Sequence, residues 1–384
     1  MPRLAFALTV LILLPMQAQA QTGARLSGYL EHQYSISLTD GRWTHLDYDR
    51  LRVDLNAVAG RGTQLSVGGV AQLFRGNTRT ARRDVLPEAL DTQVDTFSVT
   101  IRDRFYLNHA YLTLRPGPVA LTVGKQYLAW GAAYVFNPTE LFRPKNVLEP
   151  TYEREGIGAL TVRLPLGALS DLQVGLVPAG GLRTSGKLLR LRHHLAGFDV
   201  SALVAGLYEA PLPDRLGALE PLERRLTLGG DATGELFGLG TWGEATWSDH
   251  AGVRWVEATA GGNYTLRDGT MLMLEGYYNG RGAWSKTYLA DLWFGRVSGH
   301  LRSLGKGLLY AGVSRPMDAF QLWTAGLSAL VNPGDGSAVL ITAVSYAFGE
   351  NVDLLFNGLI YLGPEGTEFG GRRLGGFLRG RVYF

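Results

Sequence analysis

Charged side chains recur at alternate residues of several segments, and the segments differ in the sign of that charge. Successive side chains of a β-strand point to opposite faces, so the charges of one segment share a face. The basic set is Arg50, Arg52, Arg163, Arg190, Arg192, Arg373, Arg379 and Arg381. The acidic set is Asp231, Glu244, Glu257 and Glu275. On the inner face of a closed sheet, such sets would line a water-filled lumen and select solutes by charge.

The two sets occupy different parts of the chain. The acidic residues come from four consecutive alternating segments, whereas the last three arginines belong to the final segment, which closure would bring beside the first. We therefore expect part of the basic set to lie opposite the acids, with a transverse field across the lumen. The alternative is that the charges pair as salt bridges that only stabilise the barrel.

The sequence contains no motif for catalysis or for binding a metal. It has no cysteine, and its seven histidines form no H-E-x-x-H pair. A G-x-S-x-G nucleophile elbow is also missing. A net charge of +3 is too small to indicate a nucleic-acid partner. We expect no catalytic residue, no metal, no cofactor and no nucleic acid, and we expect that the chain is not an enzyme.

The elements that must position these charges are β-strands. Segments such as 51–57 and 256–264 alternate between apolar and polar residues. The alternating segments are about as long as a tilted strand that crosses a bilayer. The connections between successive segments alternate between tight turns and longer loops, which is typical of outer-membrane barrels. The sequence predicts an all-β, closed antiparallel transmembrane barrel of about 18 strands, with 16 as the alternative count.

The long gaps predict loops at one end of this barrel. They are residues 75–103, 131–152, 209–222 and 281–305, which we expect outside the cell or folded into the lumen, while the short turns face the periplasm. Loop 131–152 is the candidate constriction, because it combines aromatic and basic side chains that could contact sugars. These are Tyr134, Phe136, Phe142, Arg143 and Lys145. The alternative is a loop that only covers the rim.

Both ends of the chain resemble targeting signals. Residues 1–20 combine Arg3, an apolar stretch and a final Ala18-Gln19-Ala20, the pattern of a signal peptide cleaved after Ala20. The chain ends at Phe384, and a terminal aromatic is similar to the C-terminal signature that the barrel-assembly machinery recognises. We therefore expect residues 21–384 to form a barrel in contact with lipid in the outer membrane of a Gram-negative bacterium.

One stretch resembles a known family. Gly124-Lys125-Gln126, Trp130-Gly131 and Asn137-Pro138, together with the arginine-rich polar face, are similar to the alginate-export-type barrels and, more loosely, to exopolysaccharide-export barrels. This resemblance implies an outer-membrane pore that passes a polysaccharide to the exterior, with a separate periplasmic export protein as partner. The acidic set departs from a uniformly basic pore. The alternatives are a general or substrate-selective diffusion porin for small-solute uptake, and a structural or adhesive barrel.

Overall fold

The computed structural model describes most of the chain, and every structural statement below concerns the described residues. These are 23–39, 41–60, 62–81, 98–179, 181–209, 223–284, 303–318, 320, 322–371 and 373–384. The predicted signal peptide, residues 1–20, lies outside them. Parts of three predicted loops also lie outside them, namely 82–97, 210–222 and 285–302.

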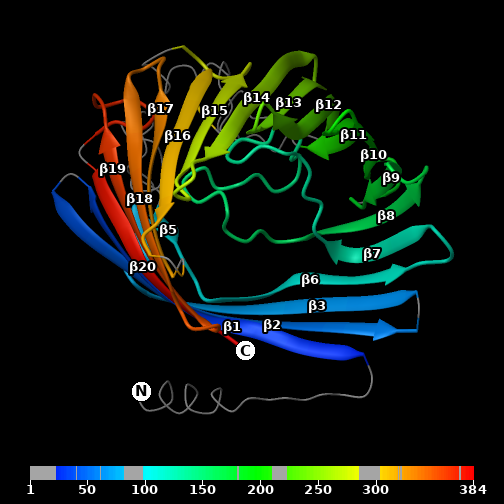
Figure 1. Ribbon diagram of the computed structural model, residues 1–384, viewed down its shortest axis with the longest axis horizontal. Helices are drawn as coiled ribbons and strands as arrows, with labels where there is room; N and C mark the ends of the chain where they lie inside the picture. The colour runs from blue at the N-terminus through cyan, green and yellow to red at the C-terminus, as the bar shows by residue number, and fades with distance from the viewer. Residues whose placement is uncertain are drawn as a thin grey trace.

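Eighteen antiparallel strands form one closed sheet (Figure 1). The ring closes where β1 pairs with β20, with Leu30 opposite Val382. The prediction of a closed antiparallel barrel with 18 strands is confirmed. The barrel strands are β1 (Ala24–Thr39), β2 (Arg42–Ala59), β3 (Thr63–Gly76), β6 (Arg104–Leu114), β7 (Ala120–Gln126), β8 (Ile157–Pro165), β9 (Ser170–Val177), β10 (Gly186–Leu195), β11 (Phe198–Glu209), β12 (Glu223–Leu236), β13 (Leu239–His250), β14 (Val253–Thr265), β15 (Met271–Asn279), β16 (Gly307–Pro316), β17 (Trp323–Asn332), β18 (Ser337–Phe348), β19 (Val352–Leu362) and β20 (Arg373–Tyr383).

Two short strands, β4 (Arg79–Ala81) and β5 (Ser98–Thr100), pair with each other in a separate sheet. No helix formed by the described residues is long and apolar enough to cross a membrane.

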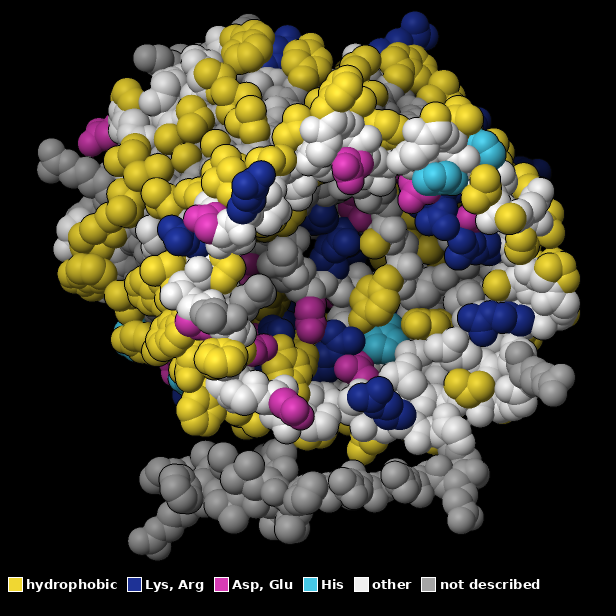
Figure 2. Space-filling model, viewed as in Figure 1, with side chains coloured by type: hydrophobic (Ala, Val, Ile, Leu, Met, Phe, Trp, Pro, Cys, Tyr) yellow, Lys and Arg dark blue, Asp and Glu magenta, His cyan; other side chains and the backbone are white. Residues whose placement is uncertain are grey.

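The strands are amphipathic with the apolar face outward. On β20, Leu378 is 54% exposed, whereas its neighbour Arg379 is 6% exposed and faces the interior of the ring. Val256 of β14 is likewise 43% exposed. Figure 2 shows hydrophobic side chains on the flank of the molecule and charged side chains around the central hollow. A lipid solvent requires this inversion of the pattern found in soluble proteins, because apolar side chains must face the acyl chains. Closing the sheet also pairs its backbone groups and leaves no edge.

The two ends of the barrel differ in their connections. One end, which we call the short-turn end, carries two-residue hairpins such as Ala196-Gly197 and Phe237-Gly238, whose residues all have positive φ angles. Such turns match the twist of the strands they join. The other end, the long-loop end, carries the connections 127–156, 178–185, 280–306 and 363–372.

Closure of the ring depends on a glycine beside the C-terminus. Gly28 exchanges two backbone hydrogen bonds with Phe384, of 3.0 and 3.1 Å. A Cβ atom at Gly28 would lie 2.2 Å from the carbonyl oxygen of Arg52 and 2.7 Å from the ring of Phe384. The backbone oxygen cannot swing away as a flexible side chain can, so a side chain at this position would force the backbone beside the β1–β20 seam to shift.

We therefore expect Gly28→Ala to destabilise the closed barrel by about 1–3 kcal/mol, the usual cost of overpacking. The measurement is the temperature at which the folded band disappears in heat-modifiability gels. Gly69→Ala is the matched control, because open space surrounds its Cβ position. Equal unfolding temperatures for the two variants would contradict the expectation.

Candidate functional site

A long loop leaves the sheet after β7 and returns to it at β8. It comprises residues 127–156, and we call it the constriction loop. Figure 1 shows it running inside the ring of strands. The predicted bounds, 131–152, are too narrow. Leu128 and Trp130 belong to no strand and pack with Leu188 and Leu203 in a buried cluster, so the loop begins earlier than the alternation suggests.

Two carboxylates of the strands hold one side of this loop. Glu244 of β13 is 4% exposed and accepts hydrogen bonds from the backbone N–H groups of Ala132 and Ala133, at 2.6 and 2.7 Å. It also accepts bonds from the side chains of Asn137 and Thr139, at 2.8 and 2.7 Å. These donors cover both of its oxygens, so Glu244 is bound by the loop.

Glu275 of β15 is fully buried and holds the next residues of the loop in the same way. It accepts the backbone N–H groups of Tyr134 at 2.8 Å, Val135 at 3.0 Å and Phe136 at 2.6 Å. The indole N–H of Trp242 donates to the same carboxylate at 2.7 Å. Charge-assisted hydrogen bonds of this kind are among the strongest in proteins.

Gly131 allows the loop to approach Glu244 so closely. Its φ angle is +94°, a backbone conformation that residues with a side chain rarely adopt. A Cβ atom there would lie 2.5 Å from Glu244 Oε1. The glycine is therefore required both by backbone conformation and by space.

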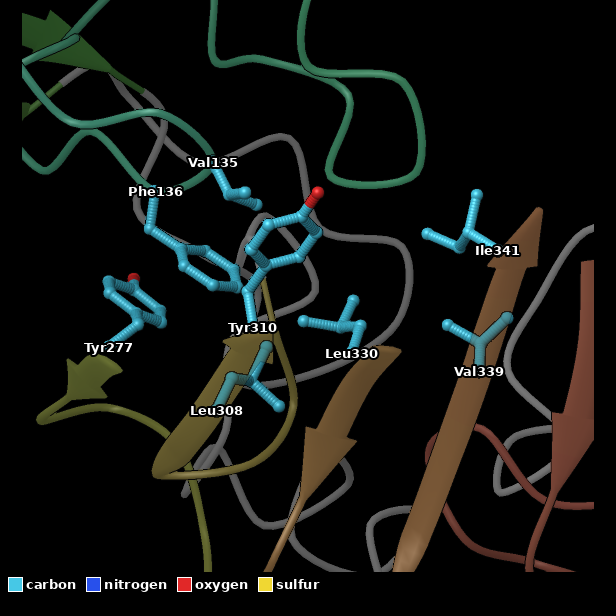
Figure 3. Packing of buried hydrophobic residues seen from close by; sticks show 8 residues of the cluster. All are labelled: Val135, Phe136, Tyr277, Leu308, Tyr310, Leu330, Val339 and Ile341. Carbon is cyan, nitrogen blue, oxygen red and sulfur yellow. The ribbon is translucent and has the colours of Figure 1, made fainter. Parts of the chain in front are cut away.

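Apolar packing seals this attachment. Val135 and Phe136 of the loop insert between side chains of β15, β16, β17 and β18 (Figure 3). The ring of Phe136 stacks on Tyr277 with a centroid distance of 4.6 Å. Tyr134 packs against Tyr310 at 5.8 Å. The loop is thus fixed to this side of the barrel by both charge and packing.

On the opposite side of the ring, carboxylates of the loop meet arginines of the strands. Glu153 lies 2.7 Å from a guanidinium nitrogen of Arg52 and 3.3 Å from one of Arg50. Glu149 forms an ion pair with Arg379 of β20. The constriction loop therefore spans the lumen and is attached to both charged walls.

A buried carboxylate lies behind these ion pairs. Glu31 of β1 is fully buried and accepts bonds from Arg381 Nε at 2.8 Å and from the hydroxyl of Tyr152 at 2.9 Å. The Tyr152 ring also lies 4.6 Å from the guanidinium carbon of Arg379. Tyr152 thus joins the loop to this ionic network by both hydrogen bonding and a cation–π contact.

Other residues of the predicted charged sets are also paired. Arg190 lies 3.1 Å from Asp231, across the intervening strand β11. Arg163 and Arg192 share Asp171, at 2.9 and 3.2 Å, near the short-turn end. Within the described part of the chain, no three His, Asp or Glu side chains are placed to hold a metal ion.

Two further residues of the predicted charged sets are Glu257 and Arg373. Glu257 accepts the hydroxyl of Tyr277 at 2.5 Å. Arg373 begins β20 and is half-buried. Most of the charges that the sequence assigns to two open walls are therefore engaged by partners, which reduces the transverse field expected from unpaired sets.

A cavity of about 340 Å³ lies between the constriction loop and the wall of β2. Its charged lining combines three guanidinium groups with three carboxylates. The most accessible of them is Arg143, whose side chain is 52% exposed and lies 3.9 Å from Glu155. The charged lining residues are Arg52, Glu140, Arg143, Glu153, Arg154 and Glu155.

The predicted constriction residues divide into two groups. Tyr134 and Phe136 are packed against the strands, and Lys145 donates to the carbonyls of Ala133 and Tyr134 at 2.7 and 3.0 Å, so these three shape the loop. Phe142 and Arg143 line the cavity. The carboxylates of the constriction loop are not among the predicted site residues, although they lie within a basic, aromatic stretch of the sequence. The missed residues are Glu140, Glu149, Glu153 and Glu155.

Another buried carboxylate binds loops at the long-loop end. Glu368 accepts the backbone N–H of Leu304 at 2.7 Å and the side-chain amide of Asn332 at 2.7 Å. Burial raises the pKa of Glu368 above the usual range of a glutamate, against the effect of these hydrogen bonds. A raised pKa means that folding favours the protonated form of Glu368 more than water does.

No family model matches the chain, and no curated protein matches it. Solved barrels match it over nearly its whole length. The outer membrane protein OprD from Pseudomonas aeruginosa is 11% identical, over 96% of each chain, with a TM-score of 0.56. OccK2 (OpdF) from P. aeruginosa, solved in complex with glucuronate, is 10% identical over 94% of this chain and 98% of that chain, with a TM-score of 0.57. OccAB3 from Acinetobacter baumannii is 12% identical over 94% and 99%, with a TM-score of 0.54.

This similarity establishes the fold that the chain shares with those proteins. With its apolar outer belt and closed ring, the chain is a β-barrel of the Gram-negative outer membrane, as predicted.

The expected export of a polysaccharide is wrong. The matching solved barrels named above are OprD and Occ proteins, and the resemblance to alginate-export barrels is not supported. The structure offers a physical reason, because the constriction loop crosses the lumen and is bound on both sides, through Glu275 and Arg379. The periplasmic export partner implied by that resemblance is likewise unsupported.

Glu275→Gln should loosen the constriction loop. The substitution keeps the size of the side chain but turns an N–H₂ group toward N–H donors of the loop, which costs about 1–3 kcal/mol for an unsatisfied group. We expect a larger and noisier single-channel conductance in planar bilayers. Glu235→Gln, at an exposed position near the end of β12, is the control. An unchanged trace for Glu275→Gln would show that this carboxylate does not restrain the loop.

The long-loop end should be held most tightly in acid. Because the folded pKa of Glu368 is raised, its contribution to stability is complete below the ordinary glutamate pKa and is lost as the pH rises through the folded value. We expect the Leu304 amide to be better protected from hydrogen exchange in acidic than in mildly alkaline buffer, after correction for intrinsic rates. Glu368→Gln should remove this dependence. Equal pH profiles for both proteins would refute the assignment.

Proposed function

We propose that the chain is a substrate-selective diffusion porin that lets small hydrophilic solutes cross the outer membrane. The observation that carries this proposal is the constriction loop, which is held against Glu244 and Glu275 on one side and against Arg52 and Arg379 on the other. A loop anchored in this way narrows a lumen that is otherwise too wide for side chains to fill. Small solutes pass such a constriction, whereas a polymer chain does not.

The charges beside the loop support selection by charge. Arg154 is paired with the buried Glu140 at 2.7 Å, and Arg52 with Glu153. Arg143 is half exposed, and among the described residues its guanidinium makes one long ionic contact, 3.9 Å to Glu155, so it is available to a passing anion. A guanidinium binds a carboxylate through two parallel hydrogen bonds. One matched barrel, OccK2, is described in complex with glucuronate. We therefore choose a small sugar acid as the probe.

The remaining features fit a passive channel. The short-turn vestibule, a cavity of about 630 Å³ lined by Arg163 and Arg192, gives the solute an exit toward the periplasm. We propose that residues 1–20 direct export and that Phe384, whose backbone pairs with Gly28 at the seam, is recognised by the barrel-assembly machinery. Transport of this kind requires no catalytic residue and no cofactor.

Liposome swelling tests this function. Vesicles containing the purified, folded protein should swell in glucuronate and in glucose, and should not swell in a large dextran. Arg143→Gln should reduce glucuronate entry several-fold relative to glucose, because it removes a charged donor worth about 1.5–3 kcal/mol before solvent screening. Arg183→Gln, in the exposed β9–β10 connection, is the control. A folded protein that admits neither small solute would overturn the proposal.

A further inference from the structure

Ionisable side chains lie on the outer, lipid-facing surface of the barrel at β1, β2 and β3, and three of them form one group. His32 shares its face of β1 with Tyr34 and Ile36, which are 46% and 40% exposed. Asp49 lies on the outer face of β2, because its neighbour Arg50 points inward to the constriction loop. Arg75 lies on the outer face of β3. We call His32, Asp49 and Arg75 the outer ionic cluster.

The members of this cluster bind one another. His32 Nδ1 lies 2.7 Å from Asp49 Oδ1, and Arg75 bonds the other oxygen of Asp49. In the strand register Arg75 lies opposite Asp47, yet its guanidinium reaches Asp49, two residues nearer the short-turn end. Long cationic side chains in a membrane usually extend toward water. Arg75 instead extends along the barrel wall to meet a carboxylate.

The cluster lies within the apolar belt. On β1, outward apolar side chains flank His32 on both sides, with Leu30 toward one end and Tyr34 toward the other. The residue opposite His32 on β20 is Gly380, which lies between the outward-facing Leu378 and Val382. Lipid tails offer no hydrogen bonds to charged groups, so ionisable residues at such a position indicate a protein neighbour or a functional site.

The surroundings also favour a protein neighbour. Phe105 of β6 is 76% exposed and Leu107 is 50% exposed on the same side of the barrel. Leu73, which lies opposite Asp49 in the register, is 39% exposed. A mixed patch of ion pairs surrounded by large apolar side chains has the composition of a subunit interface.

We propose that this face of β1, β2, β3 and β6 is the interface with a second copy of the chain. Any protein that covers the cluster must itself lie in the membrane, and this chain presents both signs of charge side by side. A two-fold axis through the cluster brings Asp49 of one copy toward His32 and Arg75 of the other, so the patch complements itself. The inference does not depend on the proposed transport function.

Cross-linking in native outer membranes tests the interface directly, because the chain contains no cysteine. A two-fold axis at the cluster places the two Leu73 positions near each other. Leu73→Cys should give a cross-linked dimer with a short bis-maleimide. Val256→Cys on the outer face of β14, with a similar exposure of 43%, should remain monomeric. Heat-modifiability gels establish that both variants are folded, and labelling by a lipid-soluble maleimide establishes that both thiols react.

Removing the charges tests their role. In the Leu73→Cys background, the combined changes His32→Gln, Asp49→Asn and Arg75→Gln should lower the dimer yield at least several-fold without loss of the folded band. An undiminished dimer would overturn the role of the charges.

Two results would overturn the dimer itself. One is an equal dimer yield from Leu73→Cys and Val256→Cys, and the other is no dimer from a folded and reactive Leu73→Cys protein. If native mass spectrometry instead finds an anionic lipid that the charge-free variant loses, the face is a lipid site and the proposed second copy is rejected.

Discussion

Two buried carboxylates, Glu244 and Glu275, set the shape of the lumen. A carboxylate without water needs several donors, and a loop without regular secondary structure has backbone N–H groups that need acceptors. Residues 132–136 of the constriction loop and these two strand residues meet both needs at once. At this attachment both carboxylates accept several hydrogen bonds and the N–H groups of residues 132–136 find acceptors, which explains how a long connection can lie inside a wide barrel.

The opposite wall uses the reverse chemistry. There the strands supply arginines and the loop supplies carboxylates, so Glu149 and Glu153 meet Arg379 and Arg52. The loop therefore neutralises both walls, with backbone dipoles on one side and side-chain charges on the other. What remains accessible beside the loop is a small cavity with Arg143 at its surface.

The outer surface follows a simpler requirement, since lipid accepts apolar side chains and rejects unpaired charges. Most outward residues obey it, as Leu378 and Val256 illustrate. The outer ionic cluster around Asp49 departs from that requirement, and its internal ion pairs show how the departure is tolerated. A second protein at this face would remove the remaining conflict with the lipid.

The alternation of apolar and polar residues and the spacing of the turns were enough to predict the fold. Period-two alternation is local, so residues such as Arg379 and Leu378 could be assigned to opposite faces, and the strand count followed from the turns. The path of the constriction loop could not be predicted in the same way. Its position depends on Glu275 meeting the N–H of Phe136, 139 residues earlier in the chain. The function expected from the resemblance failed for a related reason, because a stretch such as Asn137-Pro138 does not reveal which wall it binds. Sequence alone determined which residues face lipid and which face the lumen, since that choice is made residue by residue along each strand. Only the tertiary structure decided which lumen charges are paired and where the opening lies, because those outcomes depend on contacts between segments far apart in the chain.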